Sequence, residues 1–362
     1  MSLSTTALAA QAAPSQPGSG TREIALNPET LQQLNNLVAS KESLKQAGYV
    51  VKALSEGELE QKKRCLMCGV RHHPANESAG RNDLSLRKQA SRPAILTSRR
   101  RIVHKTWTCC GQHVTADPCT GKEHHAMPVS NNQVQLELER RWQFHATAPD
   151  IQPNHRVAVA IDCEMGTAFD GDSELIRLTI VDYFTGKTLI DSLVYPDIEM
   201  RHFNTRWSGI TRGAMERSRR QRQCIMGRDA ARRAVFDYVG PSTIVVGHGA
   251  QNDLSSLRWI HSRVVDSLII ESGIRKEAKL KAEQEKKENE EVDKDKDKEG
   301  AQEEVQKRGK HHPDGMSLKA LTMKRLGRAI QMGKNGHDSL EDALAARDLV
   351  HEYTTSLEIV SG

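Results

Sequence analysis

Apolar and polar positions separate most sharply in residues 157–165, where Val-Ala-Val-Ala-Ile is followed by Asp-Cys-Glu-Met. A short apolar run rich in Val and Ile predicts a buried strand. Because side chains alternate along a strand, Asp162 and Glu164 share one face. Two like charges on a buried face repel and are costly to desolvate, which favours a divalent cation beside them. A strand end that enters solvent is the alternative interpretation.

Similar patterns downstream predict the rest of an α/β domain. Alternating apolar residues over 174–182 and 187–195, joined by the turn Thr185-Gly186, predict an antiparallel meander of the first three strands. The later elements are expected as a helix around 234–239, a strand at 243–246, a helix holding 253–259, a strand at 264–265 and a last helix over 343–353. This order is typical of a ribonuclease-H-like fold, so we expect a mixed five-stranded sheet flanked by helices.

The segments before this domain, which we place at 156–355, differ from it in pattern. Residues 1–25 are rich in Ser, Ala, Gly and Pro, and we expect them to be disordered. Residues 26–64 predict a helical leader that starts at Asn27-Pro28, with Asn as the N-cap and Pro at the first helical position. Residues 131–155 predict a connecting helix and a linker.

The composition changes the picture within the domain. Only 37% of the 362 residues are hydrophobic and 4% are aromatic, which is lean for a fully globular chain. Much of the polar excess lies in residues 275–312, which contain Lys, Glu and Asp and almost no apolar side chains. This insert is either a solvent-exposed helical extension or a disordered loop. We favour a mobile surface insert that takes no part in chemistry.

Charge and hydropathy limit the class of protein. The net charge of +5 arises from 52 basic and 47 acidic residues, a near balance that indicates no partner by itself. The N-terminus lacks the charged start and apolar core of a signal peptide, and no stretch approaches a membrane span. We therefore expect a protein that is not secreted and has no membrane partner. Five of the seven cysteines lie between Cys65 and Cys119, which favours metal binding over disulfides.

The region 65–130 is expected to bind zinc. It opens with Cys65-Leu-Met-Cys68, a spacing that suits one tetrahedral metal, and its thin apolar content suggests folding only with the ion bound. The candidate ligands, in order of preference, are Cys65, Cys68, Cys110 and His125, followed by Cys109, Cys119 and His124. One zinc site and two are both compatible with the spacing, and unrelated buried thiols are the alternative.

Four acids and a histidine in the domain have the chemistry of a phosphodiester-cleaving centre. Asp162 and Glu164 lie on the first strand, Asp253 starts the helix after a central strand, and Asp342 starts the last helix five residues after His337. Carboxylates without lysine partners suit two Mg²⁺ or Mn²⁺ ions, which can clamp the attacking and leaving oxygens of a phosphodiester displacement. The histidine can take a proton from the attacking water.

Three motifs and one loop carry a resemblance to a known family. They are Asp162-Cys-Glu-Met165, Val246-Gly-His-Gly-Ala-Gln-Asn-Asp253-Leu254, Gly336-His-Asp-Ser-Leu-Glu-Asp342-Ala343 and Thr205-Arg-Trp-Ser-Gly-Ile210. In this order they resemble the DEDDh 3′-to-5′ exonucleases of the DnaQ-like superfamily, and especially the eukaryotic RNA exonuclease 4 and interferon-stimulated exonuclease group. The likeness covers residues 156–353 without the insert. It implies that the four acids are metal ligands and that His337 is the general base.

The resemblance also implies contacts with the substrate. Met165 is expected to contact the terminal nucleotide, while Arg206 and Trp207 hold phosphate and base beside it. His248 and Leu254, from the second motif, are expected to line the same site. For Trp207 a core position is an equally good interpretation, and for His248 a satisfied buried histidine is.

The chain departs from the family pattern at a few positions. It has Phe203-Asn204-Thr205-Arg206 where the family often has Tyr-Arg-Thr-Arg, which removes one phosphate or base contact. We interpret Asp266, part of an Asp-Ser pair that replaces Asp-Thr, as supporting the site rather than binding metal. Cys163 is expected to be a small core residue. The arginines of 217–233 either follow an RNA backbone or form a solvated face.

The sequence thus favours a metal-dependent 3′-to-5′ exoribonuclease that releases nucleoside 5′-monophosphates from a single-stranded RNA end. An exonuclease acting mainly on DNA is the first alternative, because no residue is seen to sense the 2′-hydroxyl. A catalytically silent nucleic-acid-binding adaptor is the second. The basic run 99–101 and the family likeness favour the nucleus, with the cytoplasm as the alternative.

Overall fold

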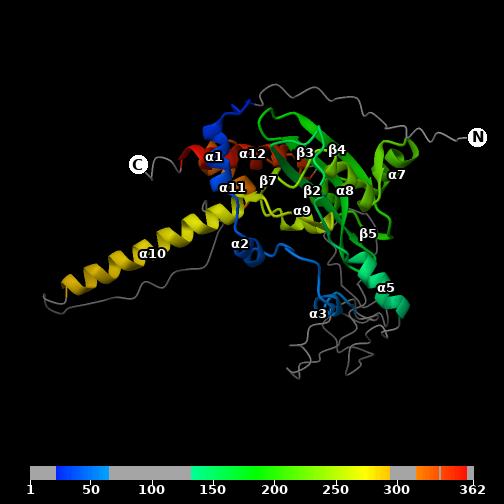
Figure 1. Ribbon diagram of the computed structural model, residues 1–362, viewed down its shortest axis with the longest axis horizontal. Coiled ribbons are helices and arrows are strands. Elements are labelled where there is room, and N and C mark those ends of the chain that lie inside the picture. Colours follow the sequence, from blue (N-terminus) through cyan, green and yellow to red (C-terminus); the bar gives the residue numbers. More distant parts are fainter. Residues whose placement is uncertain (1–21, 65–131, 294–314, 334–335, 357–362) are drawn as a thin grey trace, which may run out of the picture. The chain divides into compact units, whose positions relative to one another are not determined.

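A central mixed sheet organises the computed structural model, which describes residues 22–64, 132–293, 315–333 and 336–356 (Figure 1). The chain divides into two compact units, residues 1–52 with 145–362 and residues 53–144. The larger unit holds the sheet and all the predicted catalytic residues. Within the described residues, no helix is long and apolar enough to cross a membrane.

The main sheet has seven strands in the order β6-β4-β3-β2-β7-β9, with β5 pairing on the far part of β2. Its strands are β2 (Ala158–Ala168), β3 (Ser173–Asp182), β4 (Thr188–Tyr195), β5 (Met200–His202), β6 (Cys224–Met226), β7 (Ile244–Gly247) and β9 (Val264–Asp266). The β2-β3-β4 meander is antiparallel, whereas β7 runs parallel to β2 and β9 parallel to β7. The predicted mixed sheet is confirmed.

The predicted number of five strands is wrong because two short strands add to the sheet. β5 and β6 have three residues each and, unlike the equally short β9 with its Val264-Val265 pair, contain no β-branched pair that marks a strand in the sequence. A separate two-stranded sheet pairs β1 (His145–Ala146) with β8 (Trp259–Ile260) in parallel.

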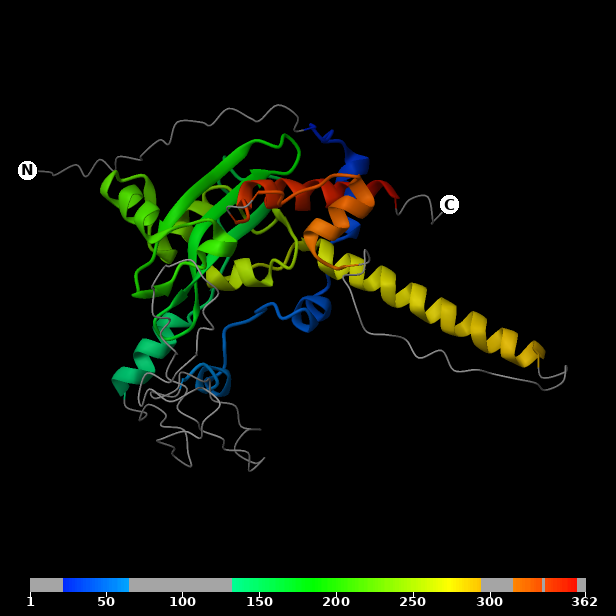
Figure 2. The same ribbon diagram turned by 180° about the vertical axis from the view of Figure 1, so that it is seen from behind.

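Helices cover both faces of the main sheet, as seen from opposite sides in Figures 1 and 2. Ala158 and Ala160 of β2 pack in a cluster with residues of α1 (Pro28–Asn36) and α12 (Ser339–Ser356). Val159 and Ile161, which point to the other face, pack in a cluster with residues of α2 (Lys41–Gln46), α8 (Arg228–Phe236) and α9 (Gln251–Ser256). The remaining helices of this unit are α6 (Thr205–Ser208), α7 (Arg212–Arg220), α10 (Ser267–Asp293) and α11 (Leu318–Leu326).

Residues 26–52 of the predicted helical leader pack on the sheet, and so does Ile24 of the segment predicted to be disordered, which is buried and donates its N–H to Phe184 O. Asn27 is the N-cap of α1, accepting a hydrogen bond from Thr30 N at 2.8 Å, and Pro28 stands at the helix start, as predicted. Leu34 is fully buried, and the Ala39 N–H donates to Val264 O of β9 at 2.9 Å. This part of the leader therefore completes the core of the larger unit.

The first part of the charged insert is helical. α10 continues to Asp293, and residues 276–285 are exposed, which matches the solvent-exposed helical extension rather than the favoured mobile insert. Local Lys–Glu pairs, such as Lys279 with Glu283, explain why so polar a segment is helical. The helix base is fixed by Glu271, which is buried and paired with Arg275 and Arg325.

In the smaller unit the structure describes α3 (Glu56–Glu60) and α5 (Asn132–Arg141). A capping box starts α3, because the Ser55 and Glu58 side chains each accept from the other's backbone N–H. The Lys62 ammonium lies 4.7 Å from the centre of the Trp142 ring. The α5 helix falls inside the predicted connecting segment 131–155.

Candidate active site

The central strand carries the first two acids of the site. β2 is buried from Ala158 to Ile161 because it lies between β3 and β7 with helices on both faces. Asp162 and Glu164 follow at its carboxyl half, opposite Thr179 and Arg177 of β3. The Glu164 side chain is 8% exposed, so its charge is largely removed from water. The predicted placement of two acids on one buried strand is confirmed.

The third acid is fastened to this strand from the neighbouring helix. Asp253 lies in the first turn of α9, which follows β7 after a short turn. Its Oδ1 accepts a hydrogen bond from the Cys163 N–H at 2.9 Å, so the carboxylate reaches β2 between Asp162 and Glu164. Asp253 is buried, and the Cys163 side chain is a core residue as expected.

The fourth acid and the histidine come from the start of α12. Asp342 is buried in the first turn of the helix, and both its oxygens accept from the Gln331 side-chain amide, at 3.1 and 3.0 Å. His337 Nδ1 lies 3.6 Å from Asp342 Oδ2, and the imidazole is 41% exposed. The two residues therefore meet at the mouth of the site, as the sequence predicted.

Gly336 permits this arrangement. Its φ is +94°, and a Cβ here would lie 2.3 Å from Gly209 N and 2.7 Å from Trp207 O. Only glycine allows the chain to pass so close to the end of α6. The His337 N–H then donates to Trp207 O at 2.5 Å, which fixes the backbone of the histidine against α6.

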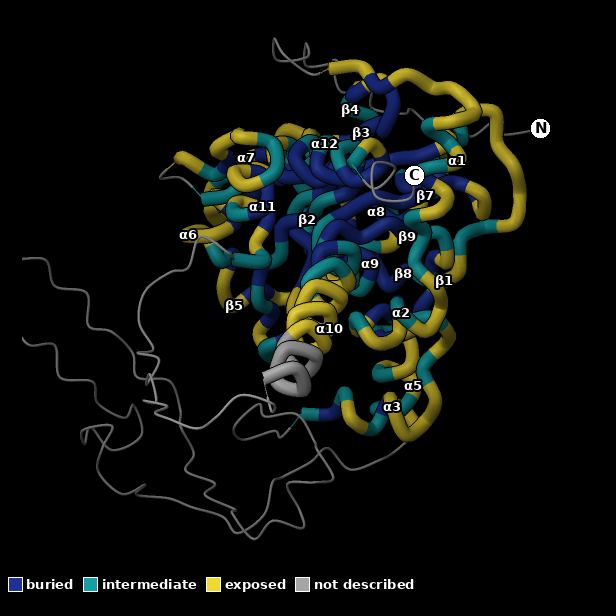
Figure 3. The backbone as a smooth tube through the Cα atoms, turned by 90° about the vertical axis from the view of Figure 1, so that its left-hand side faces the viewer, coloured by how far each residue is buried: buried dark blue, intermediate teal, exposed yellow. Residues whose placement is uncertain are grey.

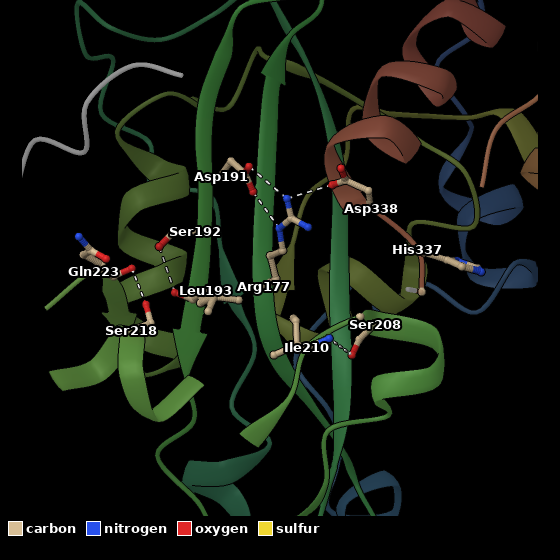
Figure 4. A pocket seen from close by; sticks show the side chains of 12 residues that line it. Arg177, Asp191, Ser192, Leu193, Ser208, Ile210, Ser218, Gln223, His337 and Asp338 are labelled. Carbon is tan, nitrogen blue, oxygen red and sulfur yellow. Dashed lines mark hydrogen bonds and ion pairs between the residues drawn. The ribbon is translucent and has the colours of Figure 1, made fainter. Parts of the chain in front are cut away.

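The segment around His337 is also tied to the sheet. Arg177 Nη2 lies 3.0 Å from Asp338 Oδ1, while its Nε and Nη2 donate to Asp191 of β4 at 2.9 and 3.1 Å. Figure 4 shows the Arg177 guanidinium between these two carboxylates, with the His337 ring pointing away from them. The Ser339 and Thr179 hydroxyls add a buried hydrogen bond of 2.7 Å.

The carboxylates of the site raise one another's pKa values. Burial raises the pKa of Asp162 well above its usual value, and the carboxylates of Asp253, Asp342 and Glu164 raise it further. Burial and Asp342 raise the pKa of Glu164 to about 8. For Asp253 burial raises the pKa to about 7, against the Cys163 N–H, which favours the charged form.

The pKa of the fourth acid is also raised. Burial raises the pKa of Asp342, although the Gln331 amide and His337 act in the opposite direction. The Arg177 guanidinium lowers the pKa of Asp162 and of Glu164 but does not balance the four carboxylates. This excess of negative charge is what a bound cation would relieve.

The carboxylate oxygens of the four acids are suitable ligands for a divalent cation. Mg²⁺ and Mn²⁺ prefer carboxylate oxygens, and four carboxylates with raised pKa values meet here. As they stand, no three His, Cys, Asp or Glu side chains of the described residues are close enough to hold one ion directly. Ion binding thus requires the carboxylates to turn toward one another. The candidate zinc ligands, Cys65, Cys68, Cys109, Cys110, Cys119, His124 and His125, all lie outside the described residues.

Three of the predicted substrate contacts lie at the surface beside the acids. The Met165 side chain is half-buried, and its carbonyl accepts from the Asn204 side chain at 3.0 Å. Trp207 is 59% exposed, which rules out the core interpretation, and its ring meets His337 edge-on at 6.2 Å between centroids. The Arg206 guanidinium lies 5.0 Å from the centre of the Trp207 ring.

The other two predicted contacts face elsewhere. Leu254 is 3% exposed and packs in the hydrophobic cluster around β2, so the structure places it in the core and not at the substrate surface. Its position in α9, next to Asp253, explains why the motif includes it. His248 Nδ1 lies 2.9 Å from Ser267 Oγ, and burial lowers its pKa, which matches the alternative of a satisfied buried histidine.

The arginines of 217–233 are divided between two roles. Arg219 pairs with Glu216 and Arg232 with Asp229, each within one helix. Arg228 pairs with the buried Glu174 of β3. Arg219 is exposed, which matches the solvated-face interpretation, whereas Arg228 and Arg232 are largely buried and match neither interpretation.

Asp266 supports the site as the sequence predicted, whereas two further residues that shape the site were not predicted. Asp266 accepts from the Gly249 and Leu268 N–H groups and from the Tyr49 hydroxyl, and so supports the turn before α9. Tyr49 comes from the leader, 217 positions away, and only the fold brings it here. Gln331, in the segment Ile330-Gln-Met-Gly, holds Asp342 through its side-chain amide.

The central strand of the mixed sheet and two helices place four carboxylates and a histidine in one region, the arrangement that the resemblance to the DEDDh exonucleases implied. No family model matches the chain. RNA exonuclease 3 of Candida glabrata is 27% identical over 340 residues, which cover 92% of this chain and 71% of that protein. The chain is thus similar to proteins named RNA exonuclease 3, which agrees with the resemblance of its motifs to the DEDDh exonucleases.

Other relatives share shorter regions. RNA exonuclease 3 of Emericella nidulans is 31% identical over 271 residues, 67% of this chain and 36% of that protein. The human apoptosis-enhancing nuclease is 31% identical over 200 residues, 53% of this chain and 48% of that protein. Among solved structures, the catalytic unit of Neurospora crassa Pan2 matches 65% of this chain and 35% of its own, with 19% identity and a TM-score of 0.39.

Proposed function

We propose that this protein is a metal-dependent 3′-to-5′ exoribonuclease that hydrolyses the terminal phosphodiester of single-stranded RNA. The observation that carries the proposal is the meeting of Asp162, Glu164, Asp253 and Asp342, from β2, α9 and α12, in one field beside His337. The names of relatives, RNA exonuclease 3 and apoptosis-enhancing nuclease, support the same reaction class.

The four acids would hold Mg²⁺ or Mn²⁺. The bound cations supply neutralising charge to the phosphodiester and to the oxygens that attack and leave. In the metal-free protein the pKa of Glu164 is raised to about 8 and that of Asp253 to about 7, so these two side chains hold protons at neutral pH, Asp253 only in part. The carboxylates must give up these protons as they become ligands.

His337 is placed to accept a proton from the attacking water. Its imidazole is partly exposed, and Nδ1 lies 3.6 Å from Asp342 Oδ2. The water oxygen forms a bond to phosphorus, and the bond between phosphorus and O3′ of the preceding nucleotide breaks. The products are a nucleoside 5′-monophosphate and a strand that is one nucleotide shorter and ends in a 3′-hydroxyl.

Trp207 and Arg206 would hold the terminal nucleotide beside this histidine. The Trp207 ring is exposed and lies against His337, so a base stacked on it would bring its phosphate near the carboxylates. The Arg206 guanidinium over the ring adds positive charge for a phosphate. Met165, whose carbonyl is held by Asn204, would contact the same nucleotide from β2.

Two further expectations complete the proposal. The Cys/His region would bind structural zinc, because five cysteines cluster between Cys65 and Cys119 in a segment with few apolar residues. The protein would act in the nucleus, since the basic run 99–101 resembles a localisation signal. Metal analysis of the full chain and imaging of a tagged chain with and without the three arginines would test these expectations.

The proposed activity is tested with 5′-labelled RNA and DNA oligomers of one sequence, with the full chain and added Mg²⁺. We expect successive loss of single nucleotides from the 3′ end of the RNA, release of 5′-monophosphates, and no hydrolysis by Asp342→Asn. Faster shortening of the DNA would favour a DNA exonuclease instead. RNA binding without any hydrolysis in Mg²⁺ or Mn²⁺ would overturn the proposal and favour an adaptor.

A further inference from the structure

A second exposed aromatic ring lies beyond the catalytic carboxylates on the same strand. Phe169 directly follows β2 and is 57% exposed, almost as much as Trp207. The Arg201 guanidinium from β5 lies 5.5 Å from the centre of its ring. An exposed aromatic ring stacked against an arginine is therefore present twice beside β2, once with Trp207 and once with Phe169.

Both pairs are held by a rigid backbone. The Phe169 N–H donates to Glu199 O at 2.9 Å, and the Ala168 N–H donates to Asp172 O at 2.8 Å, which closes a tight hairpin at the ring. Thr167 of β2 pairs with His202, one residue after Arg201. The ring and the guanidinium thus come from two strands that are hydrogen-bonded to each other. A base that stacks on such a pair finds it already in place, which limits the loss of conformational entropy on binding.

Asn204 connects the two pairs. It adopts a left-handed conformation with φ +51°, which asparagine tolerates, and its side chain donates to Met165 O at 3.0 Å. Its backbone N–H donates to His202 Nδ1 at 2.7 Å. The turn at Asn204 therefore carries the chain from Arg201 on β5 to Arg206 and Trp207 on α6, and fixes both to β2. Figure 3 shows β5 and α6 beside each other.

An arginine accompanies each of the two aromatic rings. Arg201 and Arg206 are exposed, and within the described residues neither is paired with a carboxylate. The exposed Glu199 and the half-buried Asp170 lie beside Phe169, so the charge here is mixed. Each guanidinium can still attract a phosphate at close range. The pocket of about 580 Å³ in Figure 4, by contrast, is lined by two carboxylates and one guanidinium.

We infer that Phe169 and Arg201 form a second stacking position for single-stranded RNA, which binds a nucleotide on the 5′ side of the one held at Trp207. Phe169 is five residues beyond Glu164, a distance of about 16 Å along a strand, so the position is separate from the hydrolysed bond. The position does not distinguish bases, because every base offers a face for stacking. This inference rests on the proposed function, which supplies the RNA and its direction.

Binding is measured apart from hydrolysis, with the full chain carrying Asp342→Asn and fluorescent RNA oligomers of increasing length. Adding Phe169→Ala should weaken binding of the longer oligomers by roughly 5- to 100-fold, the equivalent of about 1–3 kcal/mol for one stacked base. The loss should be smallest for the shortest oligomer, which ends before this position. Phe169→Tyr, which keeps the ring, should restore affinity, whereas Phe169→Leu, which keeps only apolar bulk, should not.

Arg201→Ala should act through charge. If the guanidinium contacts one phosphate, the slope of log affinity against log salt concentration should fall by about 0.7 for a single strand, while Phe169→Ala leaves this slope unchanged. Met226→Ala is the matched control, because Met226 is 55% exposed but lies on β6 at the opposite edge of the sheet.

The outcomes separate the two proposals. If the wild type hydrolyses RNA but Phe169→Ala binds long and short oligomers as tightly as its parent, this inference is wrong and the proposed function stands. If the wild type does not hydrolyse RNA, yet affinity depends on Phe169 and oligomer length as described, the proposed function is wrong and the stacking position stands. Equal weakening by Phe169→Leu and Phe169→Ala supports the inference only if Phe169→Tyr restores affinity.

Discussion

Replacing Glu164 by Gln tests whether the acids lie in an uncompensated negative field. In the folded, metal-free protein the pKa of Glu164 is raised from 4.5 to about 8 by burial and by Asp342. The folded state therefore binds a proton that the unfolded chain has released throughout this pH interval. By linkage, the free energy of unfolding falls as pH rises from about 4.5 to about 8, and it is unaffected by this group below and above that interval.

The magnitude follows from the pKa. One proton of difference changes the free energy of unfolding by about 1.4 kcal/mol per pH unit. Between about pH 5.5 and pH 7.5 the side chain of Glu164 alone should lower the stability of the metal-free protein by on the order of 2–3 kcal/mol. Glu164→Gln is isosteric and does not titrate, so its stability should decline less steeply by this amount over the same interval.

Urea unfolding at several pH values, with chelator present, measures the difference. Trp259 is buried in the cluster that packs on β2 and α9, so its fluorescence reports on the relevant unit. Glu277→Gln, an exposed position on α10, is the matched control and should follow the wild type. Saturating Mg²⁺ should stabilise the wild type and reduce its pH dependence, because the cation replaces the proton. Parallel curves for the wild type and Glu164→Gln in chelator would refute the reasoning.

Three further predictions follow from the site and the insert. His337→Ala should lower turnover by roughly 10²–10⁴ and flatten the acid limb of the pH–rate profile, with Mg²⁺ affinity by calorimetry little changed; a normal acid limb would contradict the general-base role. Gln331→Leu removes both hydrogen bonds that Gln331 Nε2 donates to Asp342 and should weaken Mg²⁺ binding by about 10- to 100-fold, whereas Gln223→Leu, at an exposed position, should not. Replacing residues 276–314 by a short Gly/Ser linker should preserve turnover on a short oligomer. The two ends of the replaced segment are already close, because Arg275 Nη2 donates to Gly315 O at 3.2 Å. A variant that is folded but inactive would show that the insert takes part in the reaction.

The central strand could be predicted because the residues that mark it are neighbours in the sequence. The apolar run before Asp162 has the length and branching of a buried strand, and alternation alone places Asp162 and Glu164 together. The meander that follows shows its turns in the sequence. β5 and β6 could not be found in this way, since their three residues contain neither a measurable period nor the β-branched pair that marks the equally short β9.

The helix α10 shows where composition alone misleads. Its residues 276–285 are exposed, so no apolar period marks them, and charge-rich segments are as often disordered as helical. What distinguishes this segment is its base. Glu271 is buried and accepts from Arg275, Arg325 and the Tyr353 hydroxyl, and these partners come from three different helices. A helix that starts from such a fixed turn avoids the cost of nucleation.

Contacts around the acids were hidden from the sequence for a different reason. Arg177 stands in the middle of an apolar strand, where one would expect either a functional group or a surface residue. In the structure Arg177 does two things. On β3 it lies opposite Glu164, and its guanidinium pairs with Asp338, the residue after His337. A single cation thereby lowers the pKa of two acids and ties the proposed general base to the sheet. Loss of Arg177 would perturb metal affinity and proton transfer together, so kinetic defects of Arg177 variants belong to both steps rather than to either alone.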